Sequence, residues 1–233
     1  MDTQTIFNLI ILDASGSMES IYTQALTGVN ETLATIRMAQ KEHPELLQYV
    51  TLASFSAGTD FLNRIYSVKP IAEARNITRE DYPLLGCTAL YDAMGTCISE
   101  LQQKVSNGDR VLVTIITDGY ENASRTWSGQ QIKSLVQELR QIGWTFTYIG
   151  ADQDVEKMAG EIGVQNSLRF SANAKETDEM FEKERRSRSK FYSKICCEMT
   201  SACSSMVETN DYFIDDDEPE AIPYSQEPKK TLR

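Results

Sequence analysis

IFNLIILDASGSM, residues 6 to 18, is the stretch of this chain that decides its fold. A nearly continuous run of isoleucine and leucine ends abruptly at Asp13, and two serines separated by a glycine follow. Such a run, bounded by turn residues, predicts a strand buried on both faces, as in a parallel sheet covered by helices. Because ligands of open α/β sheets bind at the carboxyl ends of the strands, we expect Asp13, Ser15 and Ser17 to lie at the rim of a rigid sheet.

The side chains at this strand end are one carboxylate and two hydroxyls within one short turn. They include no imidazole and no thiolate, so the set favours Mg²⁺, Mn²⁺ or Ca²⁺ over zinc or copper. Gly16 allows the backbone to bend between the serines, and side chains at alternate positions of a turn can point the same way. A simpler interpretation needs no ligand: Ser17 caps the following helix, and Asp13 only ends the strand.

A second segment repeats this design. Val111–Thr117 reads VLVTIIT and is followed directly by Asp118. If the two strands lie side by side, Asp13 and Asp118 share one edge of the sheet. Thr88 lies in GCTALYD, residues 86–92, just before an apolar pattern that predicts a helix. Its simpler role is again that of a helix N-cap.

The rest of the chain alternates predicted helices and strands. Apolar residues recur at helical spacing over residues 22–36, and Ser128 with Gln131 fits a capping box before another helix. Residues 49–55 and 61–68, joined by a turn, indicate a hairpin. The alternation predicts an α/β domain with a doubly wound, mostly parallel central sheet, one antiparallel edge strand and helices on both faces. The helix after the capping box is predicted to bury Ile132, Leu135, Val136, Leu139 and Ile142.

We expect this α/β domain to occupy residues 1–195 and an acidic, flexible tail to occupy residues 196–233. A basic cluster precedes the acidic tail, and charge blocks of this kind are usually solvated. The basic residues are Lys183, Arg185, Arg186, Arg188, Lys190 and Lys194.

Apolar residues inside the acidic tail, at 212–214, suggest a docking segment. One hypothesis is that the carboxylates of residues 211–217 occupy the metal-ion site of the same chain or of a neighbour, since tethering gives a local concentration on the order of millimolar. The tail would then act as an autoinhibitor or mediate self-association. A rival docking place is formed by Arg185, Arg186 and Arg188 through charge attraction. A solvated tail that touches nothing is the third interpretation.

Composition excludes several classes of protein. The chain has 233 residues and a net charge of −11, which argues against nucleic acid as the main partner. It contains no apolar run of about 18 residues and no signal-peptide pattern, so we expect a cytoplasmic protein with no membrane partner. The five cysteines match no zinc motif and are expected to be reduced. The one histidine, His43, is expected in a solvated loop, and nothing places it near the serines for a Ser-His-Asp mechanism.

Three fragments, in this order along the chain, resemble a von Willebrand factor A (VWA) domain with a metal-ion-dependent adhesion site, or MIDAS. They are Asp13-x-Ser15-x-Ser17 after a buried strand, Thr88 in its glycine-containing loop, and Asp118 in Thr-Asp-Gly. Any one fragment is weak, but three in the right order are specific. The resemblance covers roughly residues 5–170 and departs from the family at Cys87, where glycine is common.

The resemblance implies a role for each matching position. The hydroxyls of Ser15, Ser17 and Thr88 would bind the ion directly or through water. Asp13 and Asp118 would supply negative charge, largely through bound waters and hydrogen bonds. The family metal is usually Mg²⁺, and a carboxylate of a partner protein often completes its coordination.

We therefore expect a stand-alone cytoplasmic interaction module, not an enzyme, that binds a partner's Asp or Glu through the metal ion. The alternative is a Mg²⁺-dependent, phosphatase-like hydrolase with Asp13 as nucleophile. Haloacid-dehalogenase-type enzymes place a second Asp two residues after the nucleophile, where this chain has Ser15, and no clear phosphate-binding lysine motif follows. Neither G-x-G-x-x-G nor the P-loop pattern occurs, which disfavours a nucleotide-binding protein.

Overall fold

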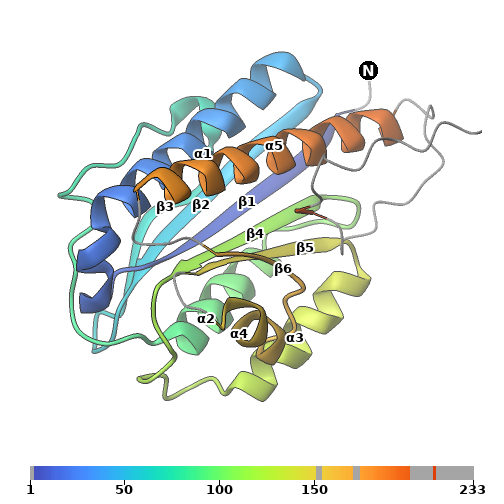
Figure 1. Cartoon of the computed structure of the whole chain (residues 1–233). Helices are drawn as coiled ribbons and strands as arrows, with labels where there is room; N and C mark the ends of the chain where they lie inside the picture. The colour runs from blue at the N-terminus through green and yellow to red at the C-terminus, as the bar shows by residue number, and fades with distance from the viewer. Residues whose placement is uncertain (1–2, 151–153, 170–173, 200–211, 214–233) are drawn as a thin grey trace, which may run out of the picture.

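A six-stranded sheet with helices on both faces dominates the part of the chain that the structure describes (Figure 1). The computed structural model describes residues 3–150, 154–169, 174–199 and 212–213. The strand order is β3-β2-β1-β4-β5-β6, and all neighbouring strands are parallel except β2 and β3. This architecture confirms the predicted fold class, including the antiparallel edge strand.

The strands are β1 (Gln4–Asp13), β2 (Leu46–Phe55), β3 (Leu62–Pro70), β4 (Arg110–Thr117), β5 (Trp144–Gly150) and β6 (Asn166–Arg169). The helices are α1 (Tyr22–Glu42), α2 (Leu90–Gln102), α3 (Gly129–Gln141), α4 (Val155–Glu161) and α5 (Ala174–Met199). Two short 3₁₀ segments, η1 (Gly16–Ile21) and η2 (Ile71–Glu73), complete the described elements. Helices α1 and α5 cover one face of the sheet, and α2, α3 and α4 cover the other (Figure 1).

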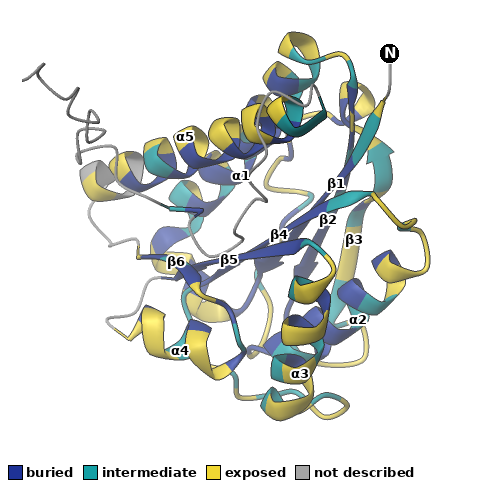
Figure 2. Cartoon of the chain, turned by 90° about the vertical axis from the view of Figure 1, so that its right-hand side faces the viewer, coloured by how far each residue is buried: buried dark blue, intermediate teal, exposed yellow. Residues whose placement is uncertain are grey.

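Strand β1 is the buried centre of the sheet. All its residues from Ile6 onward are buried, and successive side chains enter opposite cores. Ile10 packs under α1 and α5, whereas Leu9 packs under α2 and α3. Figure 2 shows the burial of the central strands. Because β1 pairs with both β2 and β4, its carboxyl end is held from two sides.

Helix α3 confirms one sequence prediction and corrects another. Ser128 and Gln131 form the predicted capping box, in which each side chain bonds the backbone N–H of the other residue. The prediction that Ile142 is buried is wrong, because its side chain is 68% exposed. The helix ends at Gln141, and the chain turns through Ile142 and Gly143, whose φ is +93°, into β5. Ile142 therefore leaves the apolar stripe.

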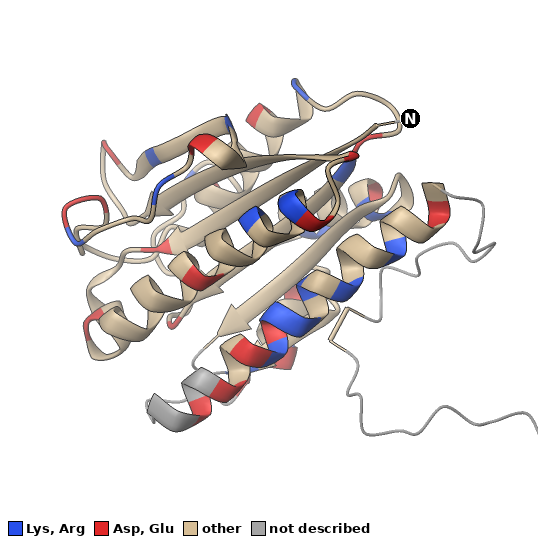
Figure 3. Ribbon diagram, turned by 90° about the horizontal axis from the view of Figure 1, so that it is seen from above, with Lys and Arg blue, Asp and Glu red and all other residues tan. Residues whose placement is uncertain are grey.

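Helix α5 corrects the prediction of a solvated basic cluster. It runs past residue 195 to Met199, and its surface carries alternating acidic and basic residues (Figure 3). Arg185 is exposed as predicted, but Arg188 is 0% exposed and forms an ion pair of 2.7 Å with Glu184. The face of α5 that carries Arg188 packs on the sheet, so the Arg188 charge is paired with Glu184 inside the protein and is not exposed to the acidic residues of the tail.

Two tail residues, Tyr212 and Phe213, also lie against this part of the molecule. Tyr212 is 8% exposed, contacts the ring of Phe191 and donates its backbone N–H to Asn166 Oδ1 at 3.1 Å. Residues 211 and 214–217, which include all the aspartates of this segment, lie outside the described residues. The hypothesis that they reach the metal-ion site therefore stays a prediction.

The four described cysteines, Cys87, Cys97, Cys196 and Cys197, are free thiols. Cys203 lies outside the described residues. In the described ranges, every helix is too short or too polar to span a bilayer.

Helices α1 and α5 approach closely at Gly28. A Cβ atom added there would lie 1.8–2.3 Å from ring atoms of Phe181, which is itself buried. We expect Gly28→Ala to lower the free energy of unfolding by about 1–3 kcal/mol through overpacking. Gly160→Ala in α4 is the matched control, because nothing lies within 4 Å of its added Cβ. Urea denaturation should show the control unchanged or more stable by up to about 1 kcal/mol, and equal effects of the two substitutions would contradict the close approach.

Candidate metal-ion site

The ends of β1 and β4 bring the two predicted carboxylates to one edge of the sheet. β1 ends at Asp13 and its parallel neighbour β4 ends at Thr117, directly before Asp118. Ser17 links the two strand ends: its Oγ donates to Asp118 Oδ1 at 2.8 Å and lies 3.1 Å from Ser15 Oγ. The predicted convergence of these side chains is therefore present.

Asp13 is the most buried member of the group, with 0% exposure. Its Oδ1 accepts the backbone N–H of Ser15 at 2.7 Å, and its Oδ2 accepts the hydroxyl of Thr117 at 2.6 Å. Burial raises the pKa of the Asp13 carboxyl above its usual value, and repulsion from Asp118 adds to this, whereas the two hydrogen bonds oppose it. Burial also raises the pKa of Asp118.

Thr88 reaches the same edge from the loop before α2. Its backbone N–H donates to Asn122 Oδ1 at 3.0 Å, and its carbonyl accepts the N–H groups of Asn122 and Ala123, both at 3.1 Å. Thr88 is 3% exposed. Its position is therefore fixed by the loop that follows β4.

Gly119 shows how closely these groups converge. A Cβ atom added there would lie 3.0 Å from Thr88 Oγ1, 3.5 Å from Ser17 Oγ and 3.9 Å from Asp13 Oδ2. Three oxygen atoms, two from the end of β1 and the turn after it and one from the loop before α2, thus border the same small space beside the segment that follows β4. Since Ser15 and Asp118 bond to Ser17, all five predicted residues lie in one cluster.

The simpler interpretation, that Ser17 and Thr88 only cap the helices that follow them, is wrong. The N-cap residues of η1, α1 and α2 are Ser15, Ile21 and Ala89, and none of them makes a side-chain capping bond. Ser17 and Thr88 instead direct their hydroxyls toward the cluster. Their positions are consistent with binding and not with helix capping.

Two further residues support the cluster: Tyr82, which was not predicted, and Gly86, the glycine expected in the Thr88 loop. The hydroxyl of Tyr82 donates to the carbonyl oxygen of Asp13. Gly86 has φ +64° and accepts the N–H of Gly16 at 3.0 Å through its carbonyl, which joins the Thr88 loop to the serine turn. Ser17 is exposed and Asp118 is partly exposed, so the cluster is open to solvent on this side.

The donor set fits a hard divalent cation. It contains two carboxylates and three hydroxyls, all oxygen, around a space that a side chain at position 119 would fill. Burial raises both carboxyl pKa values, and a cation would offset the cost of keeping both groups charged.

No protein-family model and no curated protein sequence matches the chain. Among solved structures, it is similar to the pilus adhesin SpaC of Lactobacillus rhamnosus GG in its open conformation, with a TM-score of 0.61, 14% identity and coverage of 82% of this chain and 31% of that one.

It is also similar to the PilB minor pilin of Streptococcus sanguinis, with a TM-score of 0.55, 14% identity and coverage of 82% and 63%. The SpRpn10 VWA domain is similar as well, with a TM-score of 0.54, 8% identity and coverage of 75% of this chain and 92% of that domain. This chain thus spans less than two thirds of either pilus protein and nearly all of the VWA domain. At such identities the likeness concerns the fold alone: the chain has the α/β architecture of a VWA domain.

Proposed function

We propose that the chain is a non-catalytic protein-interaction module that binds Mg²⁺ at the sheet edge and, through the ion, a carboxylate of a partner protein. Mn²⁺ and Ca²⁺ are chemically similar candidates for the same oxygen donors. The ion would be held by Ser15, Ser17 and Thr88, with Asp13 and Asp118 supplying charge. The observation that carries the proposal is the space beside Gly119, bordered by oxygens of Asp13, Ser17 and Thr88.

The hydrogen bonding of Asp13 explains why an external carboxylate is expected. Both oxygens of Asp13 already accept hydrogen bonds inside the protein, so Asp13 is not expected to be a direct ligand of the ion. The groups of the site nearest to solvent are the Ser17 hydroxyl and the partly exposed Asp118. An ion held mainly by neutral hydroxyls keeps a strong attraction for an anionic ligand. An aspartate or glutamate from another protein is suited to that position.

The burial of Asp13 disfavours the alternative function, that of a phosphatase-like hydrolase with Asp13 as nucleophile. A nucleophilic carboxylate must reach a phosphorus atom, whereas Asp13 is 0% exposed and its oxygens are occupied. We expect no hydrolysis of a generic aryl phosphate above the buffer rate with Mg²⁺ present. Turnover that disappears in Asp13→Asn would favour the hydrolase.

A cytoplasmic location also belongs to the proposed function, and the free thiols of the described cysteines are compatible with it.

We expect Asp118→Ala to weaken Mg²⁺ binding at least about tenfold, because it removes a charge and the acceptor of the Ser17 hydroxyl. Isothermal titration calorimetry with MgCl₂ measures the change. Asp60→Ala is the matched control, since it removes an exposed carboxylate from the turn that follows β2. Equal Mg²⁺ affinity in the wild type and Asp118→Ala would contradict the site, as would a preference for zinc there.

A further inference from the structure

A second group of metal-ligating side chains lies at the opposite edge of the sheet. His43 follows α1, Glu45 precedes β2, and Cys196 lies near the carboxyl end of α5. His43 Nδ1 lies 3.7 Å from Glu45 Oε1, and Cys196 Sγ lies 3.5 Å from that oxygen. One ligand atom from each residue lies within 4.8 Å of the other two.

From this geometry we propose that His43, Glu45 and Cys196 bind a zinc-class divalent ion. This site is independent of the oxygen-lined site at the other edge. A thiolate, an imidazole and a carboxylate form a mixed sulfur, nitrogen and oxygen set, which suits Zn²⁺ or Co²⁺ and is poor for Mg²⁺. Three protein ligands leave a fourth tetrahedral position for water or an external ligand.

The ligand distances are close to those around a tetrahedral zinc ion. Zinc binds sulfur at about 2.3 Å and nitrogen or oxygen at about 2.0–2.2 Å, so its ligand atoms lie roughly 3.3–3.7 Å apart. The Cys196 Sγ to Glu45 Oε1 separation of 3.5 Å falls in this range. The His43 Nδ1 to Glu45 Oε1 separation of 3.7 Å is slightly longer than the roughly 3.3–3.5 Å of a nitrogen–oxygen pair around zinc. Small side-chain rotations would therefore complete the site.

The backbone on both sides of the cluster is anchored. The N–H of His43 donates to the Ala39 carbonyl at 2.8 Å, and the His43 carbonyl accepts the N–H of Leu46 at 3.0 Å. The Glu45 carbonyl accepts the N–H of Gln4 at 2.9 Å. On α5, an ion pair of 2.8 Å between Arg110 and Glu198 fixes the turn that carries Cys196.

Without metal, the thiol of Cys196 keeps its proton. Burial, with the neighbouring Glu45, raises its pKa to about 12, and Sγ donates to the Glu45 carboxylate. Metal binding replaces that proton: Zn²⁺ takes the thiolate, and the proton passes to solvent. The bound ion would join the last turns of α5 to the turn between α1 and β2.

Cobalt titration of the reduced, metal-free full chain tests the site. Co²⁺ bound to a thiolate gives a near-ultraviolet charge-transfer band and strong visible bands. We expect these bands in the wild type, their loss in Cys196→Ser and their retention in Cys197→Ser, which changes the exposed neighbouring thiol. Zn²⁺ should displace the cobalt, whereas excess Mg²⁺ should not.

Two further variants make the result decisive. His43→Gln should weaken Co²⁺ binding at least about tenfold while keeping the charge-transfer band at saturating metal. If circular dichroism shows that Cys196→Ser does not fold, the weaker Co²⁺ binding of His43→Gln still tests the site. Asp118→Ala should leave the bands unchanged, which separates this site from the oxygen-lined one. The proposal is overturned if the wild type gives no charge-transfer band, if Cys196→Ser keeps it, or if Cys197→Ser loses it.

Discussion

Replacing Arg188 by methionine is expected to lower the free energy of unfolding by about 3–5 kcal/mol, as found when one member of a buried ion pair is removed. Arg188 is 0% exposed and Glu184 is 1% exposed. The substitution leaves the Glu184 carboxylate in the interior without its counter-charge. Methionine keeps much of the apolar volume, so the loss comes mainly from charge and hydrogen bonding.

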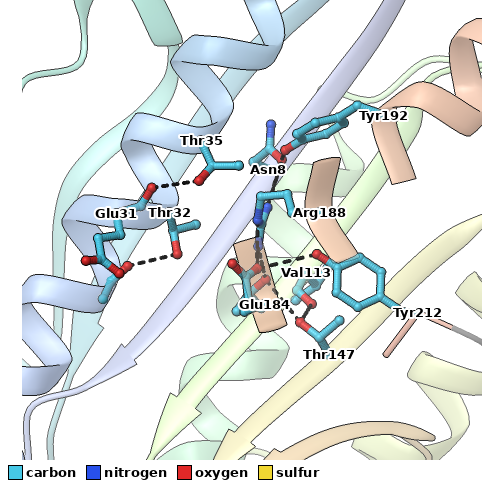
Figure 4. Close-up of polar contacts among 12 residues, drawn as sticks. Asn8, Glu31, Thr32, Thr35, Val113, Thr147, Glu184, Arg188, Tyr192 and Tyr212 are labelled. Atoms are coloured by element: carbon cyan, nitrogen blue, oxygen red, sulfur yellow. Dashed lines mark hydrogen bonds and ion pairs between the residues drawn. The ribbon is translucent and has the colours of Figure 1, made fainter. Parts of the chain in front are cut away.

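The bonds around Arg188 explain the size of this effect (Figure 4). Its Nε donates to Glu184 Oε1 at 2.7 Å, one Nη donates to Thr114 Oγ1 at 2.8 Å, and the other donates to Asn8 Oδ1 at 3.2 Å. Although burial alone would lower the pKa of Arg188, the Glu184 carboxylate holds it well above its usual value. One side chain therefore ties α5 to the two central strands.

Arg185→Met is the matched control on the same helix. Arg185 pairs with Glu182, but the two side chains are 49% and 48% exposed. Exposed pairs contribute at most about 1 kcal/mol, so urea denaturation should separate the two variants clearly. The double variant Glu184→Gln with Arg188→Met should recover part of the loss because no buried charge remains. Similar stability of Arg185→Met and Arg188→Met would contradict this account.

The two central strands could be predicted because each is one apolar run that ends in aspartate. Since parallel neighbours end at the same edge, this pattern also placed Asp13 and Asp118 together. The burial of Arg188 was not predicted from the sequence, because the basic residues 183–194 were treated as one charged block. Which of them lie on the face of the helix that packs on the sheet was not considered. A signal existed in β1: Asn8 interrupts its buried apolar run, and a buried amide requires polar partners. Arg188 and Tyr192 donate to Asn8 Oδ1, and Asn8 Nδ2 donates to Gln48 and to the Tyr49 carbonyl.

Other parts of the site left no usable signal in the sequence. Tyr82 supports Asp13 from 69 positions away, and Asn122 supports Thr88 from 34 positions away. Both lie in loops, where neither helical nor strand periodicity applies. His43 lies in the loop after α1, as predicted, but its side chain is only 28% exposed and not fully solvated. Its nearness to Cys196 depends on how α5 docks, which no local pattern encodes.

The largest effect on metal binding is expected from Gly119→Ala, a substitution that removes no ligand. If the proposed function is right, Mg²⁺ affinity should fall at least about 100-fold, or about 2.7 kcal/mol. The added Cβ would lie 3.0 Å from Thr88 Oγ1 and 3.5 Å from Ser17 Oγ, so it would occupy the space between these hydroxyls. Calorimetric titration with MgCl₂ measures the loss.

Gly119→Ala separates binding from stability because the backbone there needs no glycine. The φ of Gly119 lies outside the left-handed region, unlike that of Gly86 at +64°, so alanine introduces no backbone strain. The nearest atom to the new Cβ is a side-chain oxygen of Thr88, which can rotate away from its present position. We therefore expect thermal unfolding of the metal-free protein to change by only a few degrees, while stabilisation by added Mg²⁺ disappears. A variant that keeps wild-type Mg²⁺ affinity would show that the ion does not bind between these hydroxyls.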